Sequence, residues 1–189
     1  MIEAELKARV HDVESVQAAL SARSDGRRSR YQDTYYDVAD ARLSSEGREL
    51  RVRTITAYDE RRSLLTYKEP VVDVASGSKP EYETEVADPA VIDAVLRGLG
   101  LSELVSFEKD CINYRFSSEG RELLATLVTV PELDGTFIEL ETVVPEAELA
   151  EALEVVRTTL RQLGITDSDL TTEQYTDAVL ATRGTLELP

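Results

Sequence analysis

The sequence predicts an α+β protein: an eight-stranded antiparallel β-barrel, closed or nearly closed, with helices packed outside it. Strand-like segments recur along the chain, and short turn signals join several neighbours, which implies antiparallel pairing. Several of these segments also have one apolar and one charged face. Closure into a barrel would point the charged faces inward and leave the apolar outer face to helices. Charge buried at this density requires pairing or an ionic ligand.

The first expected strand covers residues 2–10. Side chains alternate between the two faces of a strand, so one face of this segment is entirely apolar. Its other face carries Glu3, Glu5, Lys7 and Arg9. Alternate residues lie about 7 Å apart along a strand, so two carboxylates and an ammonium group can share one site, the carboxylates on a metal ion and the ammonium on a phosphate oxygen. An edge strand with a solvated face is the alternative interpretation.

Seven more strands are expected, and their charged faces segregate by sign. Acidic residues alternate on the first, fifth and last strands, whereas basic residues lie on the strands between them. This segregation fits a cation lying beside a polyanion, and paired arginines suit phosphate oxygens. The expected strands are 30–37, 47–58, 61–69, 79–87, 104–117, 120–131 and 134–143. The charged residues singled out on them are Arg51, Arg53, Lys68, Glu81, Glu83, Glu85, Lys109, Arg115, Glu139 and Glu141.

Four helices are expected, and start signals, stop signals or apolar stripes identify them. Residues 89–98 follow Asp88 as the N-cap and begin with Pro89. Residues 146–163 carry an apolar stripe that ends before Gly164. The expected helices are 12–22, 89–98, 146–163 and 171–182.

Length and composition limit the classes of protein. We expect residues 1–189 to form a single domain that includes both C-terminal helices. A net charge of −16 argues against non-specific binding of nucleic acid or anionic membranes. The chain has no run of 18 apolar residues and no recognisable secretory leader, and its one cysteine excludes an internal disulfide, so a cytoplasmic protein is expected. To bind a polyphosphate, such an acidic chain must concentrate its few cations in an enclosed place, so the positions of its 21 basic residues are the test.

These residues resemble, in order and over nearly the whole chain, the CYTH superfamily. This is the triphosphate-tunnel fold of class IV adenylyl cyclases, thiamine triphosphatases and inorganic triphosphatases. The family's Glu-x-Glu-x-Lys is similar to residues 3–7, and its late Gly-x-Phe-x-Glu-x-Glu is similar to residues 135–141. The segment 78–85 resembles the class IV cyclase branch. Other segments that resemble the family are 32–37, 43–53 and 65–68.

The resemblance implies a site for a triphosphate and a divalent cation. The implied triphosphate contacts are Lys7, Arg51, Arg53, Lys68 and Lys109, with Arg115 as a further candidate. The implied ligands of Mg²⁺ or Mn²⁺ are Glu3, Glu5, Glu139 and Glu141. Glu5 and Lys7 are the candidate catalytic residues, and a metal-bound hydroxide is the alternative to Glu5 as the base.

Three functions remain open at this point. A class IV adenylyl cyclase, converting ATP to cyclic AMP and pyrophosphate, is the first expectation. The second is a hydrolase of tripolyphosphate or of an organic triphosphate such as thiamine triphosphate. The third is a repurposed tunnel that binds another small ligand without phosphoryl transfer. The fold family also implies a possible homodimer.

Two positions depart from the family pattern. The sixth strand reads Lys109-Asp110-Cys111 where the family has Lys-x-Arg, and Arg115 on the same face is the candidate replacement. The seventh strand lacks the family's metal-binding aspartate, and Thr129 is expected in its place. Loss of a phosphate cation and a metal ligand would weaken catalysis or retune the site, which favours the third function.

Overall fold

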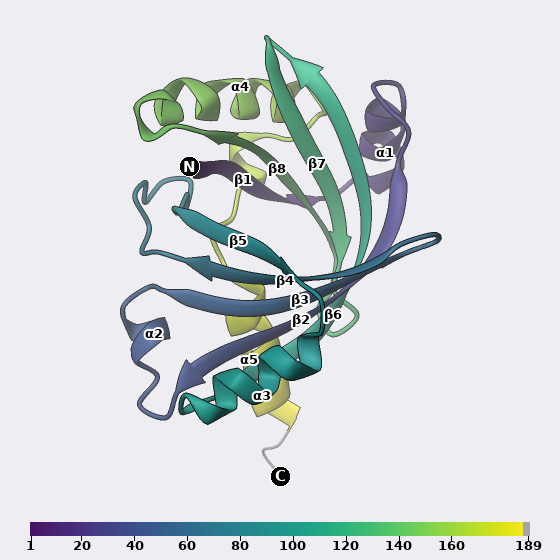
Figure 1. Cartoon of the computed structure of the whole chain (residues 1–189). Coiled ribbons are helices and arrows are strands. Elements are labelled where there is room, and N and C mark those ends of the chain that lie inside the picture. The colour runs from purple at the N-terminus through teal and green to yellow at the C-terminus, as the bar shows by residue number, and fades with distance from the viewer. Residues whose placement is uncertain (187–189) are drawn as a thin grey trace.

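The computed structural model describes residues 1–186, and its centre is one curled antiparallel sheet of eight strands (Figure 1). This confirms the predicted nearly closed barrel. The strands are β1 (Ile2–Val10), β2 (Arg27–Val38), β3 (Glu49–Ala57), β4 (Arg61–Lys68), β5 (Glu81–Val86), β6 (Leu101–Ser118), β7 (Arg121–Thr129) and β8 (Thr136–Val144). Their order across the sheet is β1-β8-β7-β6-β2-β3-β4-β5.

The barrel has a seam between its two edge strands, β1 and β5. One isolated antiparallel bridge joins Ile2 to Pro80 across it. The backbone N–H of Glu5 also donates to the hydroxyl of Ser78, at 3.4 Å. The loop 69–80 therefore ties β1 to the end of the β4–β5 pair, and the barrel is nearly closed there.

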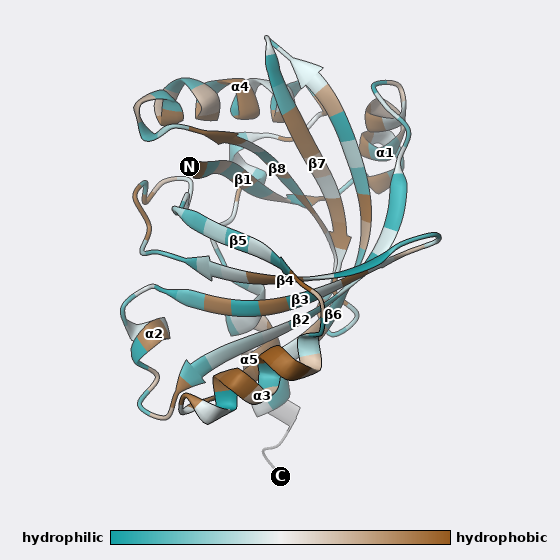
Figure 2. Cartoon of the chain, viewed as in Figure 1, coloured by the Kyte–Doolittle hydropathy of each residue, from teal (hydrophilic) through white to brown (hydrophobic). Residues whose placement is uncertain are grey.

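The apolar outer face of the sheet packs against helices, as predicted. Helices α1 (Val13–Ser21) and α4 (Leu149–Gln162) cover this face near β1, and hydrophilic and hydrophobic residues alternate along the strands (Figure 2). The largest core cluster includes Leu6, Ala8, Val10, Val16, Leu20, Leu140, Val156 and Leu160. Because one face of β1 enters this core, the charged residues of β1 must point into the barrel.

Capping interactions fix two of the remaining helices. Helix α3 (Pro89–Gly98) begins as predicted, because the Asp88 carboxylate accepts from the N–H of Ala90 at 2.9 Å. Helix α2 (Arg42–Ser45) was not predicted; the Asp37 carboxylate accepts from the N–H of Leu43 at 2.9 Å and stabilises it. Short 3₁₀ helices cover Glu146–Glu148 and Asp167–Asp169. Within residues 1–186, no helix is long and apolar enough to cross a membrane.

The last helix, α5 (Tyr175–Leu186), differs from the prediction in its bounds and its place. The predicted start at residue 171 is wrong because Leu170 and Thr171 bond to β1 instead, and the helix begins only at Tyr175. Leu170 forms an isolated bridge with Ala8, and the N–H of Thr171 donates to the carbonyl of Lys7 at 2.9 Å. From there α5 packs against the inner face of the sheet, where an apolar cluster includes Tyr35, Phe107, Cys111, Val128, Phe137, Tyr175 and Val179.

Candidate active site

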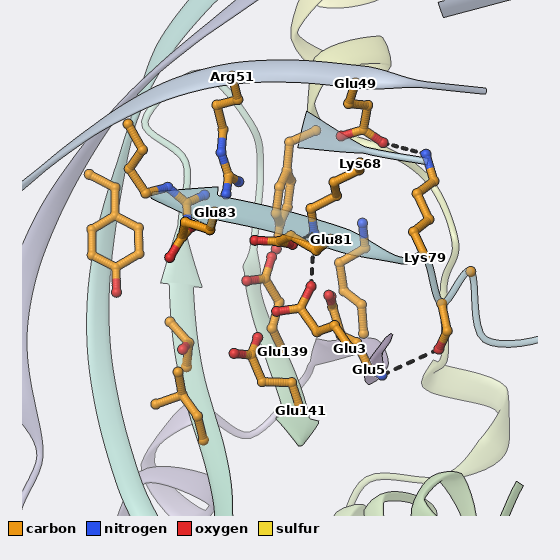
Figure 3. Close-up of a pocket in the computed structure, with 18 of the residues that line it drawn as sticks. Glu3, Glu5, Glu49, Arg51, Lys68, Lys79, Glu81, Glu83, Glu139 and Glu141 are labelled. Atoms are coloured by element: carbon orange, nitrogen blue, oxygen red, sulfur yellow. Dashed lines mark hydrogen bonds and ion pairs between the residues drawn. The ribbon is translucent and has the colours of Figure 1, made fainter. Parts of the chain in front are cut away.

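The inner face of the barrel encloses a charged cavity of about 370 Å³. The chain has four lysines, and all four line this cavity: Lys7, Lys68, Lys79 and Lys109. Figure 3 shows acidic and basic side chains from several strands, among them Glu3, Arg51 and Glu141, that project into it. The lysines of this acidic chain are thus concentrated in an enclosed place, as a polyphosphate site requires, whereas most of its arginines lie outside the cavity.

Every residue predicted for the site lines this one cavity. These residues are Glu3, Glu5, Lys7, Arg51, Arg53, Lys68, Lys109, Arg115, Glu139 and Glu141. The register between β1 and β8 explains part of this convergence. Glu5 lies directly opposite Glu141 on the neighbouring strand, and Lys7 lies opposite Glu139. Arg115 differs from the others because it is exposed, at the rim of the cavity.

Three of the four predicted metal ligands form a compact cluster. Carboxylate oxygens of Glu3, Glu5 and Glu141 lie within 4.8 Å of one another. Glu139 lies outside this acidic trio, and its Oε1 is 3.8 Å from Nζ of Lys109. Hard carboxylate oxygens at this spacing suit Mg²⁺ or Mn²⁺.

The acidic trio carries more negative charge than its surroundings balance. Burial, followed by Glu139 and Glu3, raises the pKa of Glu5 from 4.5 to about 7. Burial and the same acidic neighbours also raise the pKa of Glu141 well above its ordinary value. Burial opposes ionisation of Glu3 too, but Lys68 prevails and lowers the pKa of Glu3 to about 2. A divalent cation would relieve this repulsion, so the residues present fit the metal that the resemblance implies.

The raised pKa of Glu5 predicts that metal binding depends on pH. Below its pKa of about 7, a metal ion must displace the proton of Glu5. We therefore expect affinity for Mn²⁺ to rise about tenfold from pH 6 to pH 8, with proton release on binding. Calorimetric titration in buffers of different ionisation enthalpy measures both quantities. An affinity that does not change with pH would contradict this assignment.

Asp33, a residue not predicted for the site, organises its basic side. Asp33 is fully buried, and its Oδ1 and Oδ2 accept from Nε and Nη2 of Arg53 at 2.6 and 2.7 Å. Its Oδ2 also lies 3.6 Å from Nζ of Lys109. Although burial opposes ionisation, Arg53 and Arg51 hold the pKa of Asp33 well below its usual range. The sequence signal for Asp33 was its spacing. It lies two residues from Tyr31 and two from Tyr35, so the three side chains share the face of β2 that points into the barrel.

Arg51 presents an unused donor to the cavity. Its Nη2 donates to the hydroxyl of Thr66 at 3.3 Å, and Nη1 lies 3.9 Å from Oδ2 of Asp33. Its buried Nε has no hydrogen-bond partner among the described residues. An unpaired buried donor on a cation is costly unless a ligand satisfies it, and a phosphate oxygen is a suitable acceptor.

The other two lysines, Lys68 and Lys79, are held by carboxylates, of which sequence reasoning assigned only Glu3 to the site. Nζ of Lys68 lies 2.8 Å from both Glu3 and Glu81. Lys79 pairs with Glu49 and donates to the carbonyl of Gly47 at 3.0 Å. The alternation of glutamates along β5 was the signal for Glu81, but nothing local to the sequence identifies the Lys79 partners.

The two departures from the family pattern have different structural outcomes. Cys111 packs in the apolar cluster under α5, and burial raises the pKa of its thiol to about 12, so it is not a thiolate nucleophile at neutral pH. The placement of Thr129 in the metal site is wrong. Thr126 pairs with Glu139 and lines the cavity, so Thr129, three residues on, is on the other face of β7.

Comparison with known proteins agrees with this geometry. The CYTH domain model matches residues 1–175. A putative adenylate cyclase of Methanocaldococcus jannaschii, MJ0240, is 25% identical over 178 residues, which are 93% of this chain and 97% of that protein. The structure of the PH1819 protein from Pyrococcus horikoshii OT3 has a TM-score of 0.82 and 28% identity, covering 96% of this chain and 99% of that one. HpAC1 from Hippeastrum, a putative adenylyl cyclase with a dominant triphosphatase activity, has a TM-score of 0.66 and 20% identity, covering 96% of each chain.

Proposed function

Because this chain belongs to the CYTH domain family, we propose that it is a metal-dependent enzyme that acts on triphosphates in its charged cavity. Homologues in this family act on triphosphates and generally depend on a divalent metal. One observation carries the proposal: all four lysines of the chain, together with Arg51 and Arg53, share a cavity with a trio of clustered carboxylates.

The basic residues have the geometry to bind a phosphate chain. Arg51 offers its unpaired Nε, and Arg53 is held by two hydrogen bonds to Asp33. Guanidinium and ammonium groups fixed in this way neutralise charge that develops on a leaving phosphate group. The acidic trio would hold Mg²⁺ or Mn²⁺, which when bound supplies polarisation of a phosphoryl oxygen. Glu5 is our candidate for the base that accepts the proton of the nucleophile, and a metal-bound hydroxide is the alternative.

Adenylyl cyclase is our first candidate activity. In this reaction the ribose 3′-hydroxyl attacks the α-phosphorus of ATP and pyrophosphate leaves. The likeness to the M. jannaschii relative over nearly the whole chain supports it. Triphosphatase is the second candidate, in which water attacks the terminal phosphorus. The Hippeastrum structure favours it, because a dominant triphosphatase activity exists on a similar fold.

The test is ³¹P NMR of the purified protein with Mg²⁺ or Mn²⁺ and a mixture of ATP and tripolyphosphate. A cyclic phosphodiester signal together with pyrophosphate establishes the cyclase. Orthophosphate with a shortened phosphate chain establishes the triphosphatase. We expect either reaction to stop when EDTA removes the metal. Spectra that stay unchanged with both metals would refute turnover of these substrates and favour a repurposed tunnel.

A further inference from the structure

Two lysines of the cavity lie against one aromatic ring. Nζ of Lys7 is 4.5 Å from the ring centre of Tyr175, and Nζ of Lys109 is 4.3 Å from the same point. Lys7 also donates to the backbone carbonyl of Glu173. The ring thus connects β1 and β6, two strands that are not neighbours in the sheet.

The Tyr175 ring is itself held firmly. Tyr175 is 7% exposed and forms the first residue of α5. Its ring meets that of Phe137 edge to face, with 5.4 Å between the ring centres. Val179, one turn further along α5, is fully buried in the same apolar cluster. The ring is therefore a rigid platform that the C-terminal helix inserts into the barrel.

A rigid ring can offset the free-energy cost of fixing two buried lysines close together. A lysine side chain is long and loses considerable conformational entropy when it is fixed. Two ammonium groups in one cavity also repel each other, and Lys7 is only 8% exposed and Lys109 only 4%. The negative face of an aromatic ring attracts cations, most strongly when water is excluded. One ring can therefore hold both ammonium groups within the same part of the cavity.

We propose that Tyr175 is a positioning residue that holds Lys7 and Lys109 together for binding a phosphate chain. This inference rests on the proposed function in one respect, that these two ammonium groups contact phosphate. It adds a residue of the C-terminal helix to a site otherwise built from strands. The helix is then part of the substrate-binding machinery and not only a cover for the apolar end of the barrel.

Calorimetric titration of inorganic tripolyphosphate in EDTA tests this proposal without turnover. Three variants separate the ring from its packing. Tyr175→Leu removes the ring, Tyr175→Phe keeps it, and Val179→Ala weakens the same apolar cluster without touching either lysine. We expect Tyr175→Leu to lose about tenfold in affinity, whereas Tyr175→Phe and Val179→Ala stay within about twofold of wild type. Equal affinity of Tyr175→Leu and wild type, or an equal loss in Val179→Ala, overturns the positioning role.

Isotope-labelled lysine gives a second, ligand-independent measurement. With four lysines, the folded chain should show four Cε resonances, each correlated with its own Hε protons. We expect ring currents to shift the Lys7 and Lys109 signals upfield in wild type, Tyr175→Phe and Val179→Ala, and this shift to vanish in Tyr175→Leu. Signals that do not respond to loss of the ring overturn the proposal. If wild type binds no tripolyphosphate, the proposed function fails, and these signals still show whether Tyr175 holds the two lysines.

Discussion

Replacing Glu5 with glutamine is expected to reduce metal-dependent triphosphate turnover by about a thousandfold. The change removes a negative ligand from the acidic trio of Glu3, Glu5 and Glu141, and it also removes the candidate base. Folding should not suffer, because burial and the neighbouring carboxylates already disfavour the charge on Glu5, as its pKa of about 7 indicates. Initial rates at several Mg²⁺ concentrations, with thermal unfolding of the same samples, measure both effects.

The matched control for this variant is Glu85→Gln. Glu85 lies on β5, is exposed, and does not line the cavity. We expect its rate and its metal dependence to equal those of wild type. If Glu5→Gln kept more than a tenth of the wild-type rate, Glu5 would be neither a metal ligand nor the base.

Replacing Asp33 with asparagine is expected to cost about 3–5 kcal/mol of unfolding free energy. Asp33 is fully buried and is the shared counter-ion of Arg53, Arg51 and Lys109. Without its charge these cations repel one another inside the barrel, and their burial is no longer compensated. Urea denaturation of wild type and variant near neutral pH measures this loss, with the same dependence of unfolding free energy on urea concentration applied to both.

Asp110→Asn provides the control for the Asp33 variant. Asp110 also pairs with an arginine, since its Oδ1 lies 2.9 Å from Nε of Arg30, but both side chains are at least half exposed to solvent. Water and salt screen such a pair, so the urea midpoint should hardly change. Equal effects of the two substitutions would contradict the role of Asp33 as a buried counter-ion.

Tripolyphosphate should stabilise the wild-type protein in the same assay, because a ligand that binds only the folded state raises its unfolding free energy.

The sequence predicts those parts of the site that depend on local alternation. A period of two along β1 places Glu3, Glu5 and Lys7 on one face whatever the rest of the chain does. The eight strands and the start of α3 follow from equally local signals, namely turns and the Asp88 cap. For these features, a short segment of sequence contains the physical cause.

Other parts depend on contacts between distant segments. The role of Asp33 arises only when β2 pairs with β3 on one side and β6 on the other. The error at Thr129 shows how sensitive a face is to register, because a shift by an odd number of residues along a strand turns a side chain to the opposite side of the sheet. The start of α5 is likewise affected by the bonding of Leu170 and Thr171 to β1, which no local propensity reveals.

The distribution of lysine has a practical consequence for chemical work on this protein. No lysine exposes more than 17% of its side chain, so the outer surface carries its positive charge on arginine. Acylating reagents and amine-coupled dyes would find, besides the N-terminal amine, only groups inside the cavity. Immobilisation through amines would therefore risk blocking the site, whereas protection of these lysines from acylation would report directly on its occupancy. A protease that cuts after lysine should, for the same reason, cleave the chain only once the barrel opens.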